Sequence, residues 1–286
     1  MTRLNDGDMQ GIMNQYKRNE LFFSKNYNCS LLEIGNYAMN KNYTYAELKK
    51  LKVACVPVTS GLGEISNFSK SVCSIVSDCC GVNGFVTENK NLAGIQEAYE
   101  RNADIIFMAD DDTFSAFNLK AHLYVDNAEA TGRGFAAVLE LTAGSLENKE
   151  VLVLGAGPVG CAGATYLSQK NAIVKIYDQC TDKVIDYVKK HPKVEMLKTW
   201  KNRTWDYILE ATNVANIIGE SQITNQTICS APGVPLGIEE DAVNKCKLVI
   251  HNLLELGVVT MLSGVGKEES HGKANYTLRK KESAII

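Results

Sequence analysis

Three glycines at the spacing G-x-G-x-x-G give the clearest chemical signal in this sequence. They are Gly155, Gly157 and Gly160, and they directly follow the apolar residues 151–154. In this pattern the first glycine permits a tight turn, the second lets the backbone approach a pyrophosphate, and the third lets a helix lie close on its strand. Phosphate oxygens would then accept hydrogen bonds from the free N–H groups at the start of that helix. The spacing predicts a dinucleotide-binding site.

An acidic residue in the expected place supports this interpretation. A second apolar strand, predicted over residues 172–177, ends at Asp178, about 20 residues beyond the glycines, where a carboxylate accepts hydrogen bonds from ribose hydroxyls. Gln179 and Cys180 follow, and neither is the arginine that a 2′-phosphate would need, so NAD is favoured over NADP even though Lys183 is near. The alternative is a glycine turn in an ordinary βαβ unit, with Asp178 as a solvated loop residue.

Hydroxyl and carboxylate groups follow two further strands, both nearer the N-terminus. A strand predicted over residues 52–58 leads into Thr59-Ser60-Gly61, and one predicted over residues 103–109 leads into Asp110-Asp111-Asp112. The carboxyl ends of strands form the ligand-binding edge of open α/β sheets, so these groups could hold a cationic or polar substrate. The alternatives are a structural turn for the first segment and, for the acids, a metal site or a helix cap at Asp112.

Composition and charge limit the classes of function. The chain has 286 residues and is 45% hydrophobic, which is enough for two domains with separate cores. A net charge of −3 gives no reason to expect nucleic acid or an anionic membrane as a partner. The sequence has neither a long apolar span nor a signal peptide, so we expect a cytoplasmic protein. Its nine cysteines include no C-x-x-C pair, which favours reduced, mostly buried thiols and no metal.

The order of the predicted elements indicates an α/β protein with two α/β domains. Residues 1–50 are interpreted as an N-terminal helical segment, and residues 51–140 as a substrate domain that ends in a connecting helix. Residues 141–266 are interpreted as a Rossmann-type domain with a parallel sheet that binds NAD. Residues 267–286 are charged and polar, and we expect a loose tail.

Two strands predicted later in the chain would complete the dinucleotide site. The strand over residues 205–210 ends in Ala211-Thr212-Asn213, and in a doubly wound sheet this end passes under the nicotinamide side of the cofactor. The strand over residues 227–229 is followed by a loop over residues 230–235.

Several segments, taken in this order, are similar to a known family. They are Val56-Pro57-Val58-Thr59-Ser60-Gly61, Ser66-Asn67-Phe68-Ser69, Met108-Ala109-Asp110-Asp111, Phe117-Asn118-Leu119-Lys120, Glu210-Ala211-Thr212 and Ser230-Ala231-Pro232-Gly233-Val234-Pro235. From about residue 50 to residue 262 the chain resembles the PylD family of NAD-dependent dehydrogenases of pyrrolysine biosynthesis. The resemblance implies oxidation of (3R)-3-methyl-D-ornithyl-N6-L-lysine at the carbon that bears the terminal amine. The product then closes to the pyrroline ring with loss of ammonia.

The resemblance also implies roles for individual residues. Ser60 and Asn67 would hydrogen-bond the substrate, Asp110 would hold one of its amino groups, and Leu4 would close over it. Asp110 is also the candidate proton acceptor, although binding is the favoured role. The residues that would hold NAD are Gly155, Gly157, Val159, Gly160, Asp178, Thr212, Val214, Ser230 and Pro232.

The chain departs from the family at one substrate-binding position. The family has Glu-Pro-Leu-Gly where this sequence has Asn252-Leu253-Leu254-Glu255, so a carboxylate that could grip an ammonium is missing. Either Glu255 replaces it or Asn252 provides a neutral hydrogen bond. None of the motifs contains a histidine, so histidine-based acid/base catalysis is not expected.

Two other functions remain as alternatives. A dehydrogenase of the shikimate or methylene-tetrahydrofolate type would need a lysine-centred site on the first domain, and the Ser60 and Asp110 motifs contain no lysine. A non-catalytic NAD-sensing module would bind the cofactor without turnover. The expected partner is a small-molecule substrate, and a homodimer is left open.

Overall fold

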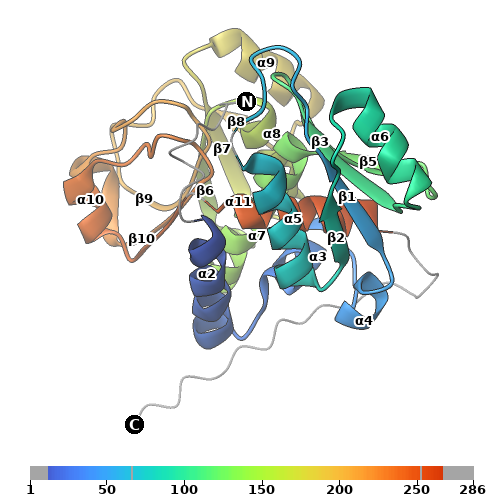
Figure 1. Cartoon of the computed structure of the whole chain (residues 1–286). Helices are drawn as coiled ribbons and strands as arrows, with labels where there is room; N and C mark the ends of the chain where they lie inside the picture. Colours follow the sequence, from blue (N-terminus) through green and yellow to red (C-terminus); the bar gives the residue numbers. More distant parts are fainter. Residues whose placement is uncertain (1–11, 66, 252, 267–286) are drawn as a thin grey trace. The chain divides into compact units, whose positions relative to one another are not determined.

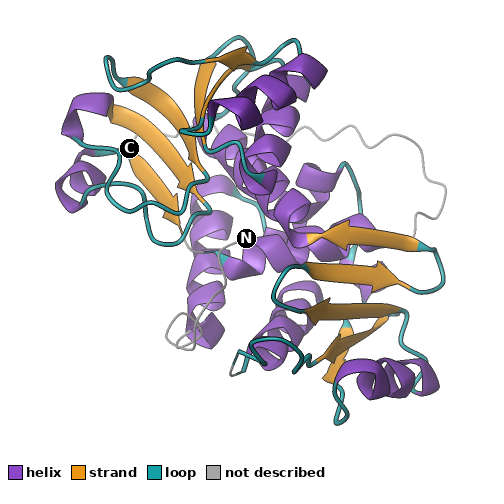
Figure 2. Ribbon diagram, turned by 90° about the horizontal axis from the view of Figure 1, so that it is seen from above, coloured by secondary structure: helices purple, strands orange, loops and turns teal. Residues whose placement is uncertain are grey.

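The computed structural model describes residues 12–65, 67–251 and 253–266, which divide into two α/β units (Figure 1, Figure 2). The first unit contains the described residues up to Ala130 together with those from Leu254 onward, and the second runs from Thr131 to Leu253. The predicted α/β fold class is confirmed. Within the described ranges, none of the helices has both the length and the apolar character needed to cross a membrane.

The sheet of the first unit has the strand order β2-β1-β3-β4-β5. Its parallel part consists of β1 (Lys52–Val56), β2 (Asn83–Val86) and β3 (Ile105–Ala109). Parallel neighbours need crossover connections, and these are α5 (Phe68–Cys80) and α6 (Asn91–Glu100). The strand β1 lies between β2 and β3 and is buried from its second residue onward, as its unbroken apolar sequence predicts.

The other two strands of this sheet run antiparallel and were not predicted. They are β4 (Phe114–Asn118) and β5 (Leu123–Asp126), and Ala109 of β3 pairs with Phe114 across a tight turn. The predicted helix cap at Asp112 is therefore wrong, because a strand follows the three acids. Residues 114–118 are too short, and too irregular in polarity, for periodicity to reveal the strand.

Helices from both ends of the chain complete the first unit. The N-terminal ones are α2 (Ile12–Tyr27), α3 (Leu31–Met39) and α4 (Tyr45–Leu48), and the C-terminal one is α11 (Leu254–Val265). A Cβ atom at Gly35 of α3 would lie only 3.0 Å from the Val259 side chain of α11, so the two helices are in close contact. The sequence grouped residues 254–266 with the Rossmann domain. The apolar pattern of α11 predicts a buried helix but not which core it enters.

The sheet of the second unit is entirely parallel, with the order β11-β10-β9-β6-β7-β8. The strands are β6 (Glu150–Leu154), β7 (Ile173–Tyr177), β8 (Glu195–Met196), β9 (Trp205–Glu210), β10 (Ile223–Ala231) and β11 (Leu248–His251). The chain moves outward from β6 to β8 and then returns to the other side of β6 with β9. This reversal is the switch point at which doubly wound sheets bind ligands.

The helices of the second unit are α7 (Asn127–Ala143), which begins in the first unit, α8 (Pro158–Gln169), α9 (Thr181–Lys190) and α10 (Glu240–Lys245), together with a short 3-10 turn, η1 (Glu220–Gln222). Close backbone packing joins α7 to α8. A Cβ atom at Gly132 would lie 2.2 Å from the carbonyl oxygen of Val159, and one at Gly163 would lie 3.0 Å from the carbonyl oxygen of Gly132. The start of α8 is therefore held by backbone contacts that no larger side chain permits.

Candidate functional site

The glycine-rich turn of the second unit has the geometry that a dinucleotide requires. Gly155 directly follows β6 with a φ of +96°, a conformation that residues with a side chain rarely adopt. A Cβ atom at Gly160 would lie 1.9 Å from the carbonyl oxygen of Gly155, so only glycine allows this packing of helix on strand. At Gly157 an added Cβ would meet nothing within 4 Å, so the backbone faces open space. A pyrophosphate can approach there, beside the N–H groups of Val159 and Gly160 in the first turn of α8.

Asp178 lies beside this turn, directly after β7. Its Oδ2 accepts a hydrogen bond of 2.7 Å from the N–H of Ala156, and its Oδ1 accepts one of 2.8 Å from the N–H of Cys180. The carboxylate is thus fixed between the glycine turn and the loop that leads to α9. Each carboxylate oxygen has a second acceptor position, which is available for ribose hydroxyls.

The strands β9 and β10 end on the opposite side of β6. Thr212 donates from both its N–H and its hydroxyl to Oε1 of Glu210, and its Oγ1 accepts from the N–H of Val214 at 3.3 Å. Val214 is exposed, and Pro232 is half-buried in the loop after β10. These three residues lie after the carboxyl ends of β9 and β10, the edge where the sequence predicts contacts with the cofactor.

Ser230, in contrast, does not present its side chain to a ligand. It is fully buried, and its hydroxyl donates a hydrogen bond of 2.8 Å to the carbonyl oxygen of Phe135 in α7. The hydroxyl therefore ties β10 to α7. The contact with NAD that the family resemblance implies would have to come from the backbone of Ser230.

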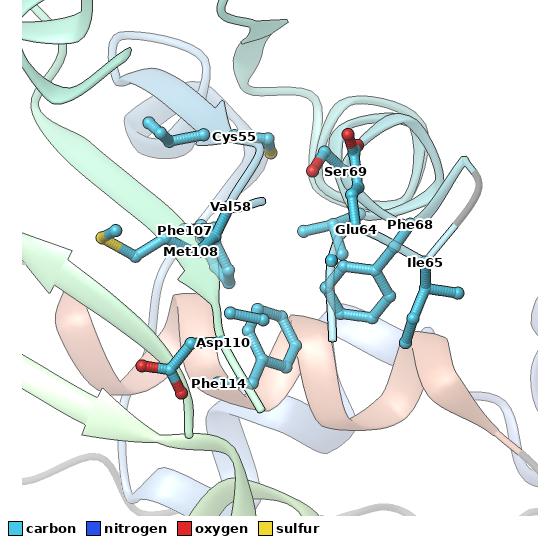
Figure 3. Close-up of a pocket in the computed structure, with 14 residues that line it drawn as sticks. Cys55, Val58, Glu64, Ile65, Phe68, Ser69, Phe107, Met108, Asp110 and Phe114 are labelled. Carbon is cyan, nitrogen blue, oxygen red and sulfur yellow. The ribbon is translucent and has the colours of Figure 1, made fainter. Parts of the chain in front are cut away.

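A pocket opens at the carboxyl edge of the first unit's sheet (Figure 3). It is lined by Cys55, Val56, Val58, Gly63, Glu64, Ile65, Phe68, Ser69, Val72, Phe107, Met108, Ala109, Asp110 and Phe114. The rings of Phe68 and Phe114 meet edge to face, with centroids 5.1 Å apart. Most of the lining is apolar, and two carboxylates, those of Glu64 and Asp110, belong to it. Such a pocket suits an aliphatic chain that carries amino groups.

Asp110 is held as a carboxylate by its own turn. Its Oδ1 accepts hydrogen bonds from the backbone N–H groups of Thr113, at 2.8 Å, and of Asp112, at 2.9 Å. These bonds lower the pKa of Asp110, and the side chain is exposed. A carboxylate with a lowered pKa is a good partner for an ammonium group and a weak proton acceptor. Of the two roles considered for Asp110, this geometry favours ion pairing.

The other two predicted substrate residues lie in segments next to the pocket lining. Ser60 is exposed in the loop after β1, and the N–H of Leu62 in that loop donates to Oδ2 of Asp111 at 2.7 Å. Asn67 precedes α5 with a φ of +63°, and its exposed side chain makes no capping hydrogen bond. The structure thus brings the loop after β1 to the turn after β3. Asp110 lines the pocket itself, whereas Ser60 and Asn67 do not.

Comparison with known proteins identifies the family. Residues 8–125 match the model described as pyrrolysine biosynthesis protein PylD, N-terminal domain. A pyrrolysine synthase of Methanosarcina barkeri is 35% identical over 215 residues, which is 75% of this chain and 81% of that protein. The chain belongs to the PylD family of pyrrolysine synthases. The family expected from the sequence motifs is confirmed.

Solved structures agree with this fold for a PylD family member. The shikimate dehydrogenase of Aquifex aeolicus superimposes with a TM-score of 0.54 at 16% identity, covering 75% of this chain and 91% of that chain. The quinate dehydrogenase of Corynebacterium glutamicum, solved in complex with NAD, superimposes with a TM-score of 0.52 at 13% identity, covering 76% of this chain and 94% of that chain. At such low identity the likeness establishes the fold alone.

The PylD family residues at the start of the chain and before α11 are only partly placed. Leu4 and Asn252 lie outside the described residues. Glu255, the proposed replacement for the family glutamate, is 1% exposed in the first turn of α11, and its Oε1 accepts a hydrogen bond from the Asn19 side chain of α2. Burial raises the pKa of Glu255, against the opposing effect of Asn19. In this structure Glu255 is occupied within the first unit and does not line the pocket.

Some lining residues were missed by sequence reasoning. Glu64 follows the predicted glycine-rich loop closely and could have been found, and its Oε2 pairs with Lys90 at 3.2 Å. Phe114 could not have been found, because its strand was not predicted.

The sequence also left open a metal site at the three acids 110–112. In the described residues, no group of three or more histidine, cysteine or acidic side chains could hold a metal ion.

The hydrogen bonds to Asp110 make a prediction about its titration. We expect the pKa of Asp110 to lie below its usual range, because two backbone N–H groups stabilise the charged form. A pKa lowered by folding adds stability above the unfolded-state pKa, and this stability is lost as the pH falls through the folded-state value. A carbon-detected NMR titration of the carboxyl group measures it directly. A pKa above the usual range would contradict the turn geometry.

Proposed function

We propose that this protein is an NAD-dependent dehydrogenase that oxidises the terminal amine carbon of (3R)-3-methyl-D-ornithyl-N6-L-lysine. The product then cyclises with loss of ammonia to give pyrrolysine. The observation that carries the proposal is the apolar pocket with the ionised Asp110, in a PylD family chain that also has a glycine turn and Asp178 for a dinucleotide.

The cofactor proposal rests on how the second unit fits NAD. The backbone N–H groups at Gly157, Val159 and Gly160 would bind the pyrophosphate, with Gly155 forming the turn, and Asp178 would accept from the ribose hydroxyls. A carboxylate there repels a 2′-phosphate, and residues 179–182 include no arginine, which favours NAD over NADP. When bound, NAD supplies the hydride acceptor. Thr212, Val214 and Pro232 would contact its nicotinamide half, with Ser230 contributing through its backbone.

The substrate's reacting nitrogen must be neutral before hydride leaves its carbon, because its lone pair stabilises the developing cation. A primary alkyl ammonium has a pKa of about 10.4, so the site must favour the deprotonated amine. Apolar side chains such as Phe68, Phe107 and Phe114 disfavour the charged form by desolvation. Asp110 would hold another amino group of the substrate as an ammonium, with Ser60 and Asn67 donating further hydrogen bonds. Asp110 is thus assigned to substrate binding. The group that accepts the proton from the reacting amine is a different one.

Ring closure follows from the substrate's own geometry. Loss of hydride and of a proton converts the amine to an imine, and the α-amine of the same ornithyl unit attacks that carbon. Ammonia leaves, and the new carbon–nitrogen double bond belongs to a five-membered ring. An intramolecular attack of this kind has a high effective molarity, so the protein needs only to hold the chain folded.

The alternative of a shikimate-type dehydrogenase is supported by the fold alone. The residues that line the described pocket include no lysine, and its predominantly apolar surface does not suit a polyhydroxylated ring. A non-catalytic NAD-binding module would have no need for an ionised carboxylate in a pocket of the other unit.

The decisive experiment mixes the purified protein, NAD and 3-methylornithyl-lysine, and follows the ultraviolet absorbance of NADH together with the mass of the product. We expect NADH to form, along with a product that has lost ammonia and two hydrogens. Binding of NAD without any reduction would refute the proposed substrate. In that case the departure at Asn252 becomes the first position to change.

In the same assay Asp110→Asn should lower kcat/KM for the dipeptide-like substrate by roughly 30-fold or more, since losing a hydrogen-bonded charge partner costs about 2 kcal/mol or more. Binding of NAD should stay unchanged. The matched control is Asp112→Asn, an adjacent exposed acid that does not line the pocket. Near-normal kinetics for Asp110→Asn would remove Asp110 from the substrate site.

Asp178→Ala should weaken NAD binding about tenfold or more, because hydrogen bonds to a charged group contribute roughly 1.5–3 kcal/mol. Isothermal titration calorimetry measures the affinity, and the thermal midpoint checks that folding is retained. Asp186→Ala, at an exposed acid of α9 in the same unit, serves as the control. Equal NAD affinity for both variants would overturn the cofactor assignment of Asp178.

A further inference from the structure

Glu210 is the buried acid at the end of β9, the strand whose carboxyl end faces the nicotinamide half of the proposed site. Its side chain is 0% exposed. Its Oε1 accepts two hydrogen bonds from Thr212, one of 2.8 Å from the N–H and one of 2.5 Å from the hydroxyl. Its Oε2 is buried with no well-aligned hydrogen-bond donor, and the backbone N–H of Gly237 beside the carboxyl group stabilises the charged form. The carboxyl group therefore orders the first residues after β9 and cannot itself touch a ligand.

The loop after β10 lies directly on the same carboxyl group. A Cβ atom at Gly237 would lie 2.6 Å from Cδ of Glu210, and one at Gly233 would lie 3.1 Å from its Oε2 and 2.1 Å from the carbonyl oxygen of Thr212. A Cβ atom at Gly233 would collide with the backbone, and one at Gly237 would push the carboxyl group of Glu210 aside. The loop over residues 232–237 is thus shaped against Glu210 and Thr212 together.

Ala211, which lies between Glu210 and Thr212 in the sequence, contacts the glycine-rich turn. The N–H of Ala211 donates to the carbonyl oxygen of Leu154 at 2.8 Å, and a Cβ atom at Gly155 would lie 2.6 Å from the carbonyl oxygen of Ala211. Residues 210–212 therefore touch both the phosphate-binding turn and the loop after β10.

The protonation of Glu210 agrees with a role inside the fold. Burial raises its pKa, with hydrogen bonds from Thr212 and from the backbone of Gly237 acting in the opposite direction, and the buried thiol of Cys229 in β10 also faces it. Burying a carboxyl group costs folding free energy by desolvation. Stability alone therefore does not explain why an acid stands here.

We propose that Glu210 is a positioning residue that couples the loop over residues 211–214 to the loop over residues 232–237, and so fixes the surface that receives the nicotinamide half of the cofactor. The link to nicotinamide rests on the proposed function. The coupling of the two loops rests only on the contacts described above.

Three variants of the full chain test this coupling. Glu210→Met keeps the length of the side chain and removes the acceptor, Glu210→Gln keeps an acceptor oxygen for Thr212, and Gly237→Ala pushes on the carboxyl group from the other loop. The control is Thr227→Val, in β10 beside the far end of β9. It removes a hydroxyl that donates at 2.6 Å to the carbonyl oxygen of Trp205 and accepts at 2.8 Å from the N–H of Thr224.

Amide hydrogen exchange, read by mass spectrometry, is the primary measurement. Glu210→Met should speed exchange about tenfold in both loops, the effect expected for loss of a buried acceptor on a local opening equilibrium. Glu210→Gln should restore protection. Gly237→Ala should raise exchange over residues 211–214 as well as in its own loop. Thr227→Val should leave both loops unchanged. Exchange that rises in one loop only, or equally in Thr227→Val, would overturn the coupling.

Ligand binding then separates this inference from the proposed function. Glu210→Met should lower kcat about tenfold or more, by misplacing the reacting ring, while affinity for ADP-ribose, which lacks nicotinamide, is retained. Equal losses of NAD and ADP-ribose binding would contradict a positioning role at the nicotinamide end. If the unmodified protein binds neither ligand, the proposed function fails, and the exchange data still decide the coupling.

Discussion

The second unit of this protein depends on backbone contacts that leave no room for a side chain. Gly160 rests on the carbonyl oxygen of Gly155, and Gly132 and Gly163 bring α7 against α8. These contacts fix the N-terminus of α8 at the end of β6, and so place its free N–H groups where a phosphate would lie. They also determine where the neighbouring strands end, because Ala211 abuts the same turn. A methyl group at any of these positions would require neighbouring atoms to move.

Carboxyl groups at the ends of strands have their pKa values shifted in opposite directions by their surroundings. Asp110 is exposed and receives backbone N–H groups, so its pKa is lowered and it remains an anion. Glu210 ends its strand in the interior, where burial raises its pKa. The first can hold an ammonium group, whereas the second can only organise its neighbours. Sequence position alone, an acid directly after an apolar strand, does not distinguish these two roles.

Much of the architecture could be predicted, because it depends on local patterns. The glycine motif and Asp178 lie within about 25 residues of each other, and each apolar strand is one short continuous segment. Such local patterns can be recognised in the sequence alone. Features that depend on tertiary partners could not be predicted. The antiparallel strands β4 and β5, the core that α11 enters and the burial of Ser230 against Phe135 are each decided by contacts with residues far along the chain. The sequence singled out Asp110 because it directly follows a predicted strand, and Asp110 lies in the pocket lining, whereas Phe114 begins a strand that was not predicted.

The return of the chain through α11 makes the first unit discontinuous in sequence. Thr131–Leu253 forms a continuous insert, whereas the first unit is built from residues on both sides of it. During synthesis the N-terminal helices and the strands β1 to β5 must wait for the whole insert before α11 can bury its apolar surface against α3. The second unit can fold as soon as its last strand has emerged. Packing of the first unit is therefore completed only after the whole second unit has been synthesised.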